Sequence, residues 1–205
     1  MLKFLAYWHP IESLSLKQLT YKTVTLVAIT SVDRAQTIHK LNVEKVSISA
    51  HGLEFVIPEI LKTSKRGKPP QIVTCVSYSD ERLDVCKYVE AYINKTLKFR
   101  VRAVRAKEEK PTQLFLSFSN GKPVLRATIS RWIRETLKLA GIDIQQYSAG
   151  TTRSASASAA FCQGASAPQI MKAGSWSNIN TFNRFYKKSN ENTPVGRLIL
   201  QQASK

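Results

Sequence analysis

The sequence lacks the features that stabilise secreted and membrane proteins. Its 205 residues hold three cysteines, Cys75, Cys86 and Cys162. Because their number is odd and they lie far apart, they predict neither a disulfide framework nor a zinc knuckle, and they indicate a reducing compartment. There is no apolar run of about 18 residues and no charged-then-apolar leader, so we expect no membrane span and no secretory signal. A soluble, intracellular protein is therefore predicted.

Acidic residues are also scarce. The sequence has 31 Lys and Arg against 14 Asp and Glu, a formal net charge of +17. Such an excess favours a nucleic-acid partner, since each neutralised phosphate releases counterions, although a ribosome-associated or simply basic protein remains an alternative. No carboxylates cluster along the chain, which disfavours a metal-dependent nuclease and predicts no metal and no cofactor.

The N-terminal part predicts two helices. Ser13 or Ser15 can cap the first, which carries an apolar stripe at i, i+3, i+4 spacing and ends near residues 30–31. Asp33 is an acceptable cap for the second, so we expect Arg34 in its first turn.

From residue 43 onward, apolar residues recur at every second position, which is the period of a strand. Alternation on either side of residues 50–52 predicts a two-stranded hairpin, with residues 71–74 as a third strand. A basic loop broken by Gly and Pro, residues 61–70, lies between them. The sheet is therefore small and antiparallel.

The middle of the chain is predicted to be mainly helical. Residues 80–97 form one helix and residues 125–140 another, ended by Gly141. The basic stretch 99–111 is expected to be a loop or irregular strand that can contact phosphate, and 114–118 a short strand. The fold class that follows is α+β, mainly helical, with residues 1–190 as one catalytic-type domain and 191–205 as a C-terminal tail that packs on its own domain or on a neighbouring protomer.

Residues 147–188 read as three short helical segments. The first starts near Thr151 or Thr152, with Arg153 in its first turn, and the second starts at residues 167–168. Ile179, Phe182 and Phe185 are spaced to bury one side of the third. Periodicity alone assigns Tyr186 to the same buried side.

This C-terminal segment resembles the signature of the tyrosine recombinases, or phage-integrase-like enzymes, and most closely their eukaryotic mobile-element branch. That signature reads like H-S-T-R-S-A-S, then A-G-x-W-S, then T-F-x-x-F-Y. Arg153 matches its arginine, Trp176 its His/Trp position and Tyr186 its nucleophile. The resemblance implies the tyrosine-recombinase catalytic-domain fold and DNA recombination or integration, in the nucleus if the host is eukaryotic.

Two further catalytic residues follow from the resemblance. Arg34 matches the first catalytic arginine, and Lys62 in the basic loop matches the hairpin lysine, with Lys65 as its substitute. The resemblance also implies contacts to double-stranded DNA from basic residues of that loop and of the 125–140 helix. These are Lys65, Arg66, Lys68, Arg126, Arg131 and Arg134.

The implied chemistry needs no metal. Tyrosine has a free pKa of about 10, so it needs positive surroundings and a proton acceptor to attack a phosphodiester. The guanidinium groups of Arg34 and Arg153 can hold the charge that develops on the phosphate, and the Trp176 indole can donate a hydrogen bond but cannot exchange a proton. Lys62 would protonate the departing 5′ oxygen, leaving a 3′-phosphotyrosyl intermediate.

Three positions depart from the signature. Gly150 replaces the motif histidine, Val32 replaces the usual glycine, and Asp33 adds a carboxylate beside Arg34. Loss of a general acid or base costs about 10²- to 10⁴-fold in rate. Three hypotheses therefore stay open: an active recombinase domain that self-associates on DNA, a catalytically impaired relative that still binds DNA, and an unrelated basic binding module. His39, on the predicted helix of Arg34, is a candidate substitute for the histidine.

Overall fold

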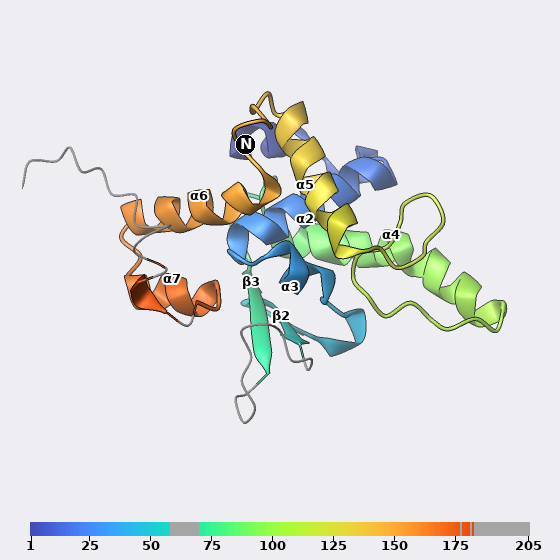
Figure 1. Cartoon of the computed structure of the whole chain (residues 1–205). Coiled ribbons are helices and arrows are strands. Elements are labelled where there is room, and N and C mark those ends of the chain that lie inside the picture. The colour runs from blue at the N-terminus through green and yellow to red at the C-terminus, as the bar shows by residue number, and fades with distance from the viewer. Residues whose placement is uncertain (58–69, 177, 181, 183–205) are drawn as a thin grey trace, which may run out of the picture.

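The computed structural model describes residues 1–57, 70–176, 178–180 and 182 (Figure 1). Its helices and strands follow one another as α1 (Leu2–Tyr7), α2 (Leu16–Thr30), α3 (Ala35–His39), β1 (Val46–Ser49), β2 (Gly52–Ile57), β3 (Gln71–Val76), α4 (Val85–Arg105), α5 (Arg126–Leu139), α6 (Ala149–Cys162) and α7 (Ala167–Ala173). Two short 3-10 turns, Ile11–Ser13 and Val43–Lys45, connect them.

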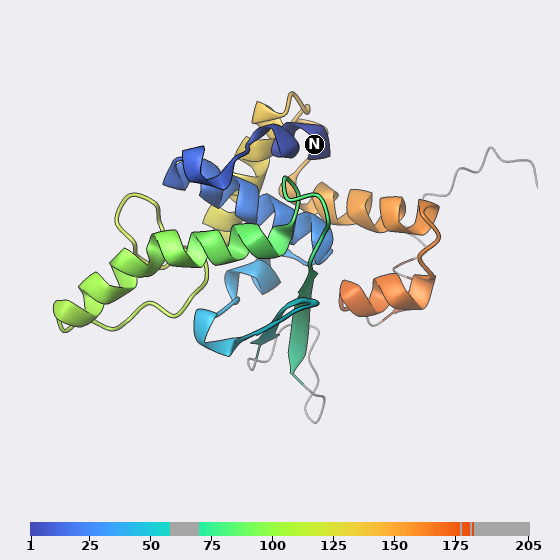
Figure 2. The ribbon, with the colours of Figure 1, turned by 180° about the vertical axis from the view of Figure 1, so that it is seen from behind.

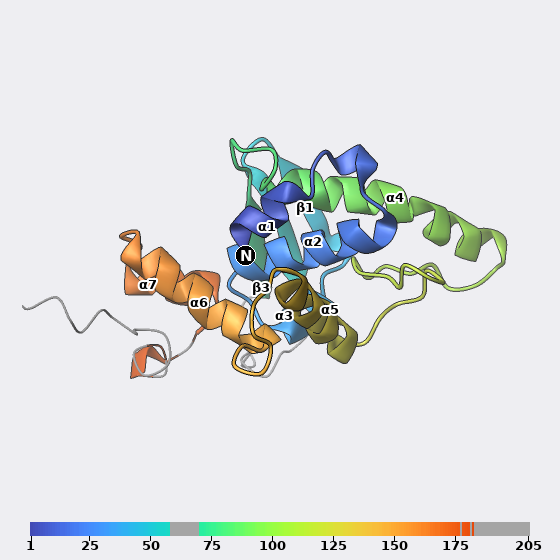
Figure 3. The ribbon, with the colours of Figure 1, turned by 90° about the horizontal axis from the view of Figure 1, so that it is seen from above.

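Helix α2 lies at the centre of the molecule. It begins with a capping box in which the Gln18 backbone N–H donates to Ser15 Oγ at 3.3 Å and the Ser15 N–H donates to Gln18 Oε1 at 3.0 Å. The choice between Ser13 and Ser15 is thus settled in favour of Ser15. Seen from above, α2 runs between α4 and α5 (Figure 3), and most of its residues are buried.

The sheet is three-stranded and antiparallel, in the order β1-β2-β3. Leu53 lies opposite Cys75 and Phe55 opposite Val73, so these four side chains share one buried face. Ile48 of β1 lies opposite buried Leu53 but is itself 64% exposed. Together with the helices, the sheet confirms the mainly helical α+β class and places the strands below α2 (Figures 1 and 2).

Helix α4 is longer than predicted and starts later. Asp84 caps it by accepting the Cys86 N–H at 3.0 Å, and the helix continues through Arg105 instead of giving way to a loop at residue 99. Arg100 was considered a phosphate contact, but it is buried and its Nη2 donates to the carbonyls of Gln113 at 2.8 Å and Leu114 at 3.1 Å. These contacts hold the guanidinium inside the protein, so the predicted role of Arg100 is wrong.

The strand predicted at residues 114–118 is not formed. That segment and its neighbours make only isolated bridges, Asn42 to Gln113 and Leu116 to Pro123. Buried Leu114, Phe115 and Leu116 pack inward without a continuous ladder, which explains why an apolar run alone suggested a strand. In the described ranges, no helix is long and apolar enough to cross a membrane.

Candidate functional site

Helix α6 positions Arg153. The Ser148 N–H donates to Thr151 Oγ1 at 3.0 Å, and this capping box starts the helix at Ala149. Arg153 therefore lies in the second turn, not in the first turn as predicted. Its side chain points inward and is only 4% exposed.

Arg153 and Trp176 are brought together, although 22 positions separate them in the sequence. The Arg153 guanidinium carbon lies 4.1 Å from the centroid of the Trp176 ring, and Arg153 Nη2 donates to the Gly174 carbonyl at 2.5 Å. This geometry is a cation–π contact with an additional backbone hydrogen bond. The orientation of the guanidinium is therefore fixed by the segment that follows α7.

An apolar cluster includes the Trp176 ring and packs against it. Phe182 packs edge-to-face on it with ring centroids 5.6 Å apart, and Val32, Ala157 and Ile170 belong to the same cluster. Phe182 is buried, as its predicted helical spacing required, whereas Ile179 is 45% exposed and does not share that side. Through Val32, the turn between α2 and α3 thus packs in the same cluster as residues of α6 and α7, next to the stacked pair of Arg153 and Trp176.

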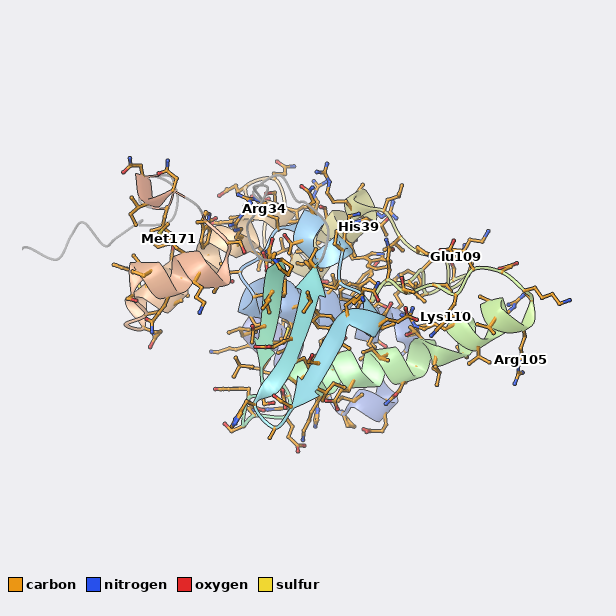
Figure 4. The ribbon with its side chains drawn as sticks, turned by 90° about the horizontal axis from the view of Figure 1, so that it is seen from below. Arg34, His39, Arg105, Glu109, Lys110 and Met171 are labelled. Atoms are coloured by element: carbon orange, nitrogen blue, oxygen red, sulfur yellow. The ribbon has the colours of Figure 1, made fainter. Side chains whose placement is uncertain are left out.

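Arg34 and Asp33 lie on that turn. Arg34 is the N-cap residue of α3 and is exposed, while Asp33 is buried and does not cap the helix. Both positions differ from the prediction, which started the helix at Asp33. In the view from below, Arg34 lies between Met171 of α7 and His39 of α3 (Figure 4).

The charges of Arg153 and Arg34 both act on the Asp33 carboxyl. Burial raises its pKa to about 7, whereas the charges of Arg153 and Arg34 act to lower it. Gln71 of β3 also donates from Nε2 to Asp33 Oδ1 at 3.0 Å. The sequence showed only the place of Asp33 beside Arg34, whereas its burial and its hydrogen bond with Gln71 of β3 were not predicted.

Gly150, the position of the motif histidine, lies in the first turn of α6 and is exposed. Of the described residues, a Cβ atom added there would meet only Ser148, whose Oγ would lie 3.6 Å away, an ordinary van der Waals distance. The site is thus sterically open to a larger residue.

The remaining predicted residues divide into two groups. Arg126, Arg131 and Arg134 are on α5 and exposed, as a surface role requires. The others, Lys62, Lys65, Arg66, Lys68 and Tyr186, lie outside the described residues, as does the 191–205 tail.

The charges of Arg34 and Arg153 both act on Asp33, and a guanidinium group can hold an anion with several oxygens. Arginine presents its N–H donors as a planar fork that matches phosphate. Across the part of the chain that the structure describes, no three His, Cys, Asp or Glu side chains gather as metal ligands would.

Solved structures of similar fold are recombinases and integrases. XerH bound to its difH substrate superposes with a TM-score of 0.65 at 12% identity, covering 100% of this chain and 50% of that one. XerA gives 0.65 at 16%, covering 100% and 62%, and the Tn1549 transposon integrase in complex with transposon right end DNA gives 0.62 at 12%, covering 98% and 62%. The chain thus spans about half to three-fifths of their lengths.

Sequence comparison agrees with the fold. Among curated protein sequences none matches this chain. The model of the phage integrase family, however, matches residues 3–193, nearly the whole sequence. The chain belongs to the phage integrase family.

Proposed function

We propose that the chain cleaves and rejoins double-stranded DNA through a covalent 3′-phosphotyrosyl intermediate. The stacking of Arg153 on Trp176, beside the turn that carries Arg34, is the observation that carries this proposal. It supports a site for one phosphate built from segments that are far apart in the sequence. Self-association on DNA is part of the proposal, since a similar structure is a lambda integrase dimer bound to a core site.

The reaction assigns one role to each residue. The Tyr186 hydroxyl gives its proton to solvent water as its oxygen attacks the scissile phosphorus. The bond from phosphorus to the 5′ oxygen breaks, and Lys62 gives a proton to that oxygen. Arg34 and Arg153 stabilise the charge on the non-bridging oxygens. A 5′ hydroxyl of another strand then reverses the step and releases Tyr186. We assign the chain to the eukaryotic mobile-element branch on the wording of its C-terminal motifs.

Tyr186→Phe tests the nucleophile. Wild-type protein incubated with nicked duplex DNA is expected to form a covalent protein–DNA complex on a denaturing gel, because the nick lets the 5′ product diffuse away. The variant should form none, since phenylalanine has no hydroxyl. Tyr7→Phe is the matched control, because Tyr7 is 84% exposed on α1, outside the proposed site. A band that survives in Tyr186→Phe assigns the nucleophile to another residue, and DNA binding without any band supports the impaired relative.

The exposed arginines of α5 give a second test. Replacing both Arg131 and Arg134 with glutamine should reduce the slope of log binding constant against log salt concentration by about 2, roughly 0.9 per lost phosphate contact. Fluorescence anisotropy with a labelled duplex measures this slope. Arg82→Gln is the control, since Arg82 already pairs with Asp80 at 2.8 Å and should leave the slope unchanged. An unchanged slope in the double variant removes α5 from the DNA interface.

A further inference from the structure

The C-terminal half of α4 projects from the body of the molecule and exposes apolar side chains. Figures 1 and 3 show this half of the helix at the end opposite α6 and α7. Its inner side is buried at Arg100 and Ala103. On its outer side Leu97 is 51% exposed, Val101 39% and Val104 54%. Three adjoining apolar side chains, unlike one that is exposed alone, indicate a surface that another molecule can cover.

The spacing of these side chains is that of a coiled-coil seam. Leu97, Val101 and Val104 follow one another at i, i+4 and i+7, which are the d, a and d positions of a heptad. Asn94 occupies the preceding a position, where a polar residue fixes the register of two paired helices. A surface groove runs along this seam and is lined by Asn94, Leu97, Lys98, Val101, Arg102 and Arg105. The face therefore has the pattern that receives a second helix.

One flank of the seam is positively charged. Lys98 and Arg105 occupy the e positions of the same heptads, and Arg102 lies beside them. All three are exposed, and none forms a salt bridge with another described residue. In the view from below, Arg105 lies at the outer end of α4, well away from Arg34 (Figure 4). The other flank is closed, because Arg100 at the g position is bonded inside the protein.

Charge and spacing together select the kind of partner. Charges at e and g positions decide which helices pair, so basic e positions favour carboxylates on the partner. A second copy of this chain is disfavoured, because antiparallel pairing would bring Lys98 and Arg105 of the two copies together and each chain carries +17. A nucleic-acid backbone would pair with the cations but leave Leu97, Val101 and Val104 in water. An acidic amphipathic helix matches both the apolar seam and its basic flank.

We propose that the outer face of α4, residues 94–105, docks an acidic amphipathic helix of a different protein. The apolar side chains of that helix pack into the seam, and its carboxylates pair with Lys98 and Arg105. The basic stretch 99–111, which was expected to contact phosphate, then contacts carboxylates through its exposed arginines. Because α4 projects at the end opposite α6 and α7, the partner is recruited through a surface that takes no part in the proposed cleavage.

A labelled helical peptide of about three heptads, with leucine at a and d and glutamate at e and g, tests the docking. The full chain should bind it with a dissociation constant on the order of 10–100 μM in fluorescence anisotropy, since the seam is only about three turns long. Leu97→Gln should weaken binding about tenfold, because it removes the largest apolar side chain of the seam. Leu139→Gln is the matched control, since Leu139 is 54% exposed on α5. Equal affinities in these two variants, or no binding to the parent, contradict docking on α4.

Charge reversal separates docking from general attraction to a basic chain. The double variant Lys98→Glu/Arg105→Glu should lose binding of the glutamate peptide and gain binding of the same peptide with lysine in place of glutamate. Arg131→Glu/Arg134→Glu changes the net charge equally, on exposed residues of α5. This control should weaken the glutamate peptide less than about twofold, because charges far from the peptide are screened by salt. A similar loss in both double variants overturns the proposal.

Amide proton–nitrogen NMR spectra identify the occupant of the face. The glutamate peptide should shift the amide resonances of residues 94–105 and leave those of α6 in place. The titration is repeated with an intact DNA duplex and Tyr186→Phe protein. Shifts at 94–105 that the duplex causes and the peptide does not would assign the face to nucleic acid and overturn the proposal. Leu97→Gln should give the parental covalent band on nicked DNA, and absence of that band from both proteins would overturn the proposed cleavage and leave the docking face standing.

Discussion

Gly150→His is expected to raise the rate of covalent complex formation on nicked DNA by about 10²- to 10⁴-fold, the usual contribution of a general acid or base. Gly150 lies three residues before Arg153 on α6, so the two positions project from neighbouring parts of one helix face. Among the residues that the structure describes, a Cβ atom at this position meets only Ser148 Oγ, at 3.6 Å, so a side chain can begin there without a clash. Its imidazole can reach the space beside Arg153 where the phosphate is expected to lie.

The control for this gain is Gly150→Ala. Alanine supplies the improvement in helix propensity, about 1 kcal/mol, but no proton-exchanging group. Single-turnover rates measured from pH 5.5 to 8.5 separate the two effects. Only the histidine variant should gain rate, and its profile should acquire a new titration near the ordinary histidine pKa of about 6.5. Equal rates in both variants would show that another residue already transfers the proton. The rate of His39→Gln would then show whether that residue is His39.

Local patterns in the sequence predicted most of the fold. The apolar spacing of α2, the serine before it and Gly141 after α5 are signals carried by a few neighbouring residues, and the structure confirms each of them. Alternation likewise predicted the three strands. The family resemblance singled out Arg153 and Trp176 as separate motif positions, and their stacking on each other is a finding of the structure that was not predicted.

The failures share one physical cause, which is tertiary contact. Arg100 looked like a surface cation because its acceptors, the carbonyls of Gln113 and Leu114, are more than ten residues away. Asp33 looked like a helix cap because the hydrogen bond that its buried carboxyl accepts comes from Gln71 of β3, which is 38 positions away. In both cases a charged residue is held inward by partners that are distant in sequence. Sequence reasoning that assigns charges to the surface cannot detect them.

Gly174→Ala is expected to lower the rate of covalent complex formation by at least about 10²-fold, the effect of a displacement of roughly 1 Å in a catalytic site. Gly174 has a φ of −87°, which alanine adopts without strain. The new methyl group, however, would lie 2.4 Å from Trp176 Cζ3 and 2.8 Å from its Cε3, so the ring must move. Because Arg153 stacks on this ring and bonds to the Gly174 carbonyl, its guanidinium must move as well.

A double-mutant cycle shows whether the displaced ring is the cause. In a Trp176→Ala background the methyl group meets no indole, so adding Gly174→Ala should change the rate by less than about twofold, and the two effects should be strongly non-additive. Gly150→Ala again serves as the glycine-to-alanine control, since it introduces no clash. Thermal unfolding of each variant accounts for any loss of folded protein. If the effects of Gly174→Ala and Trp176→Ala on the rate are additive, the methyl group acts through the backbone after α7. The stacking of Arg153 on Trp176 would then not be the cause of the lower rate.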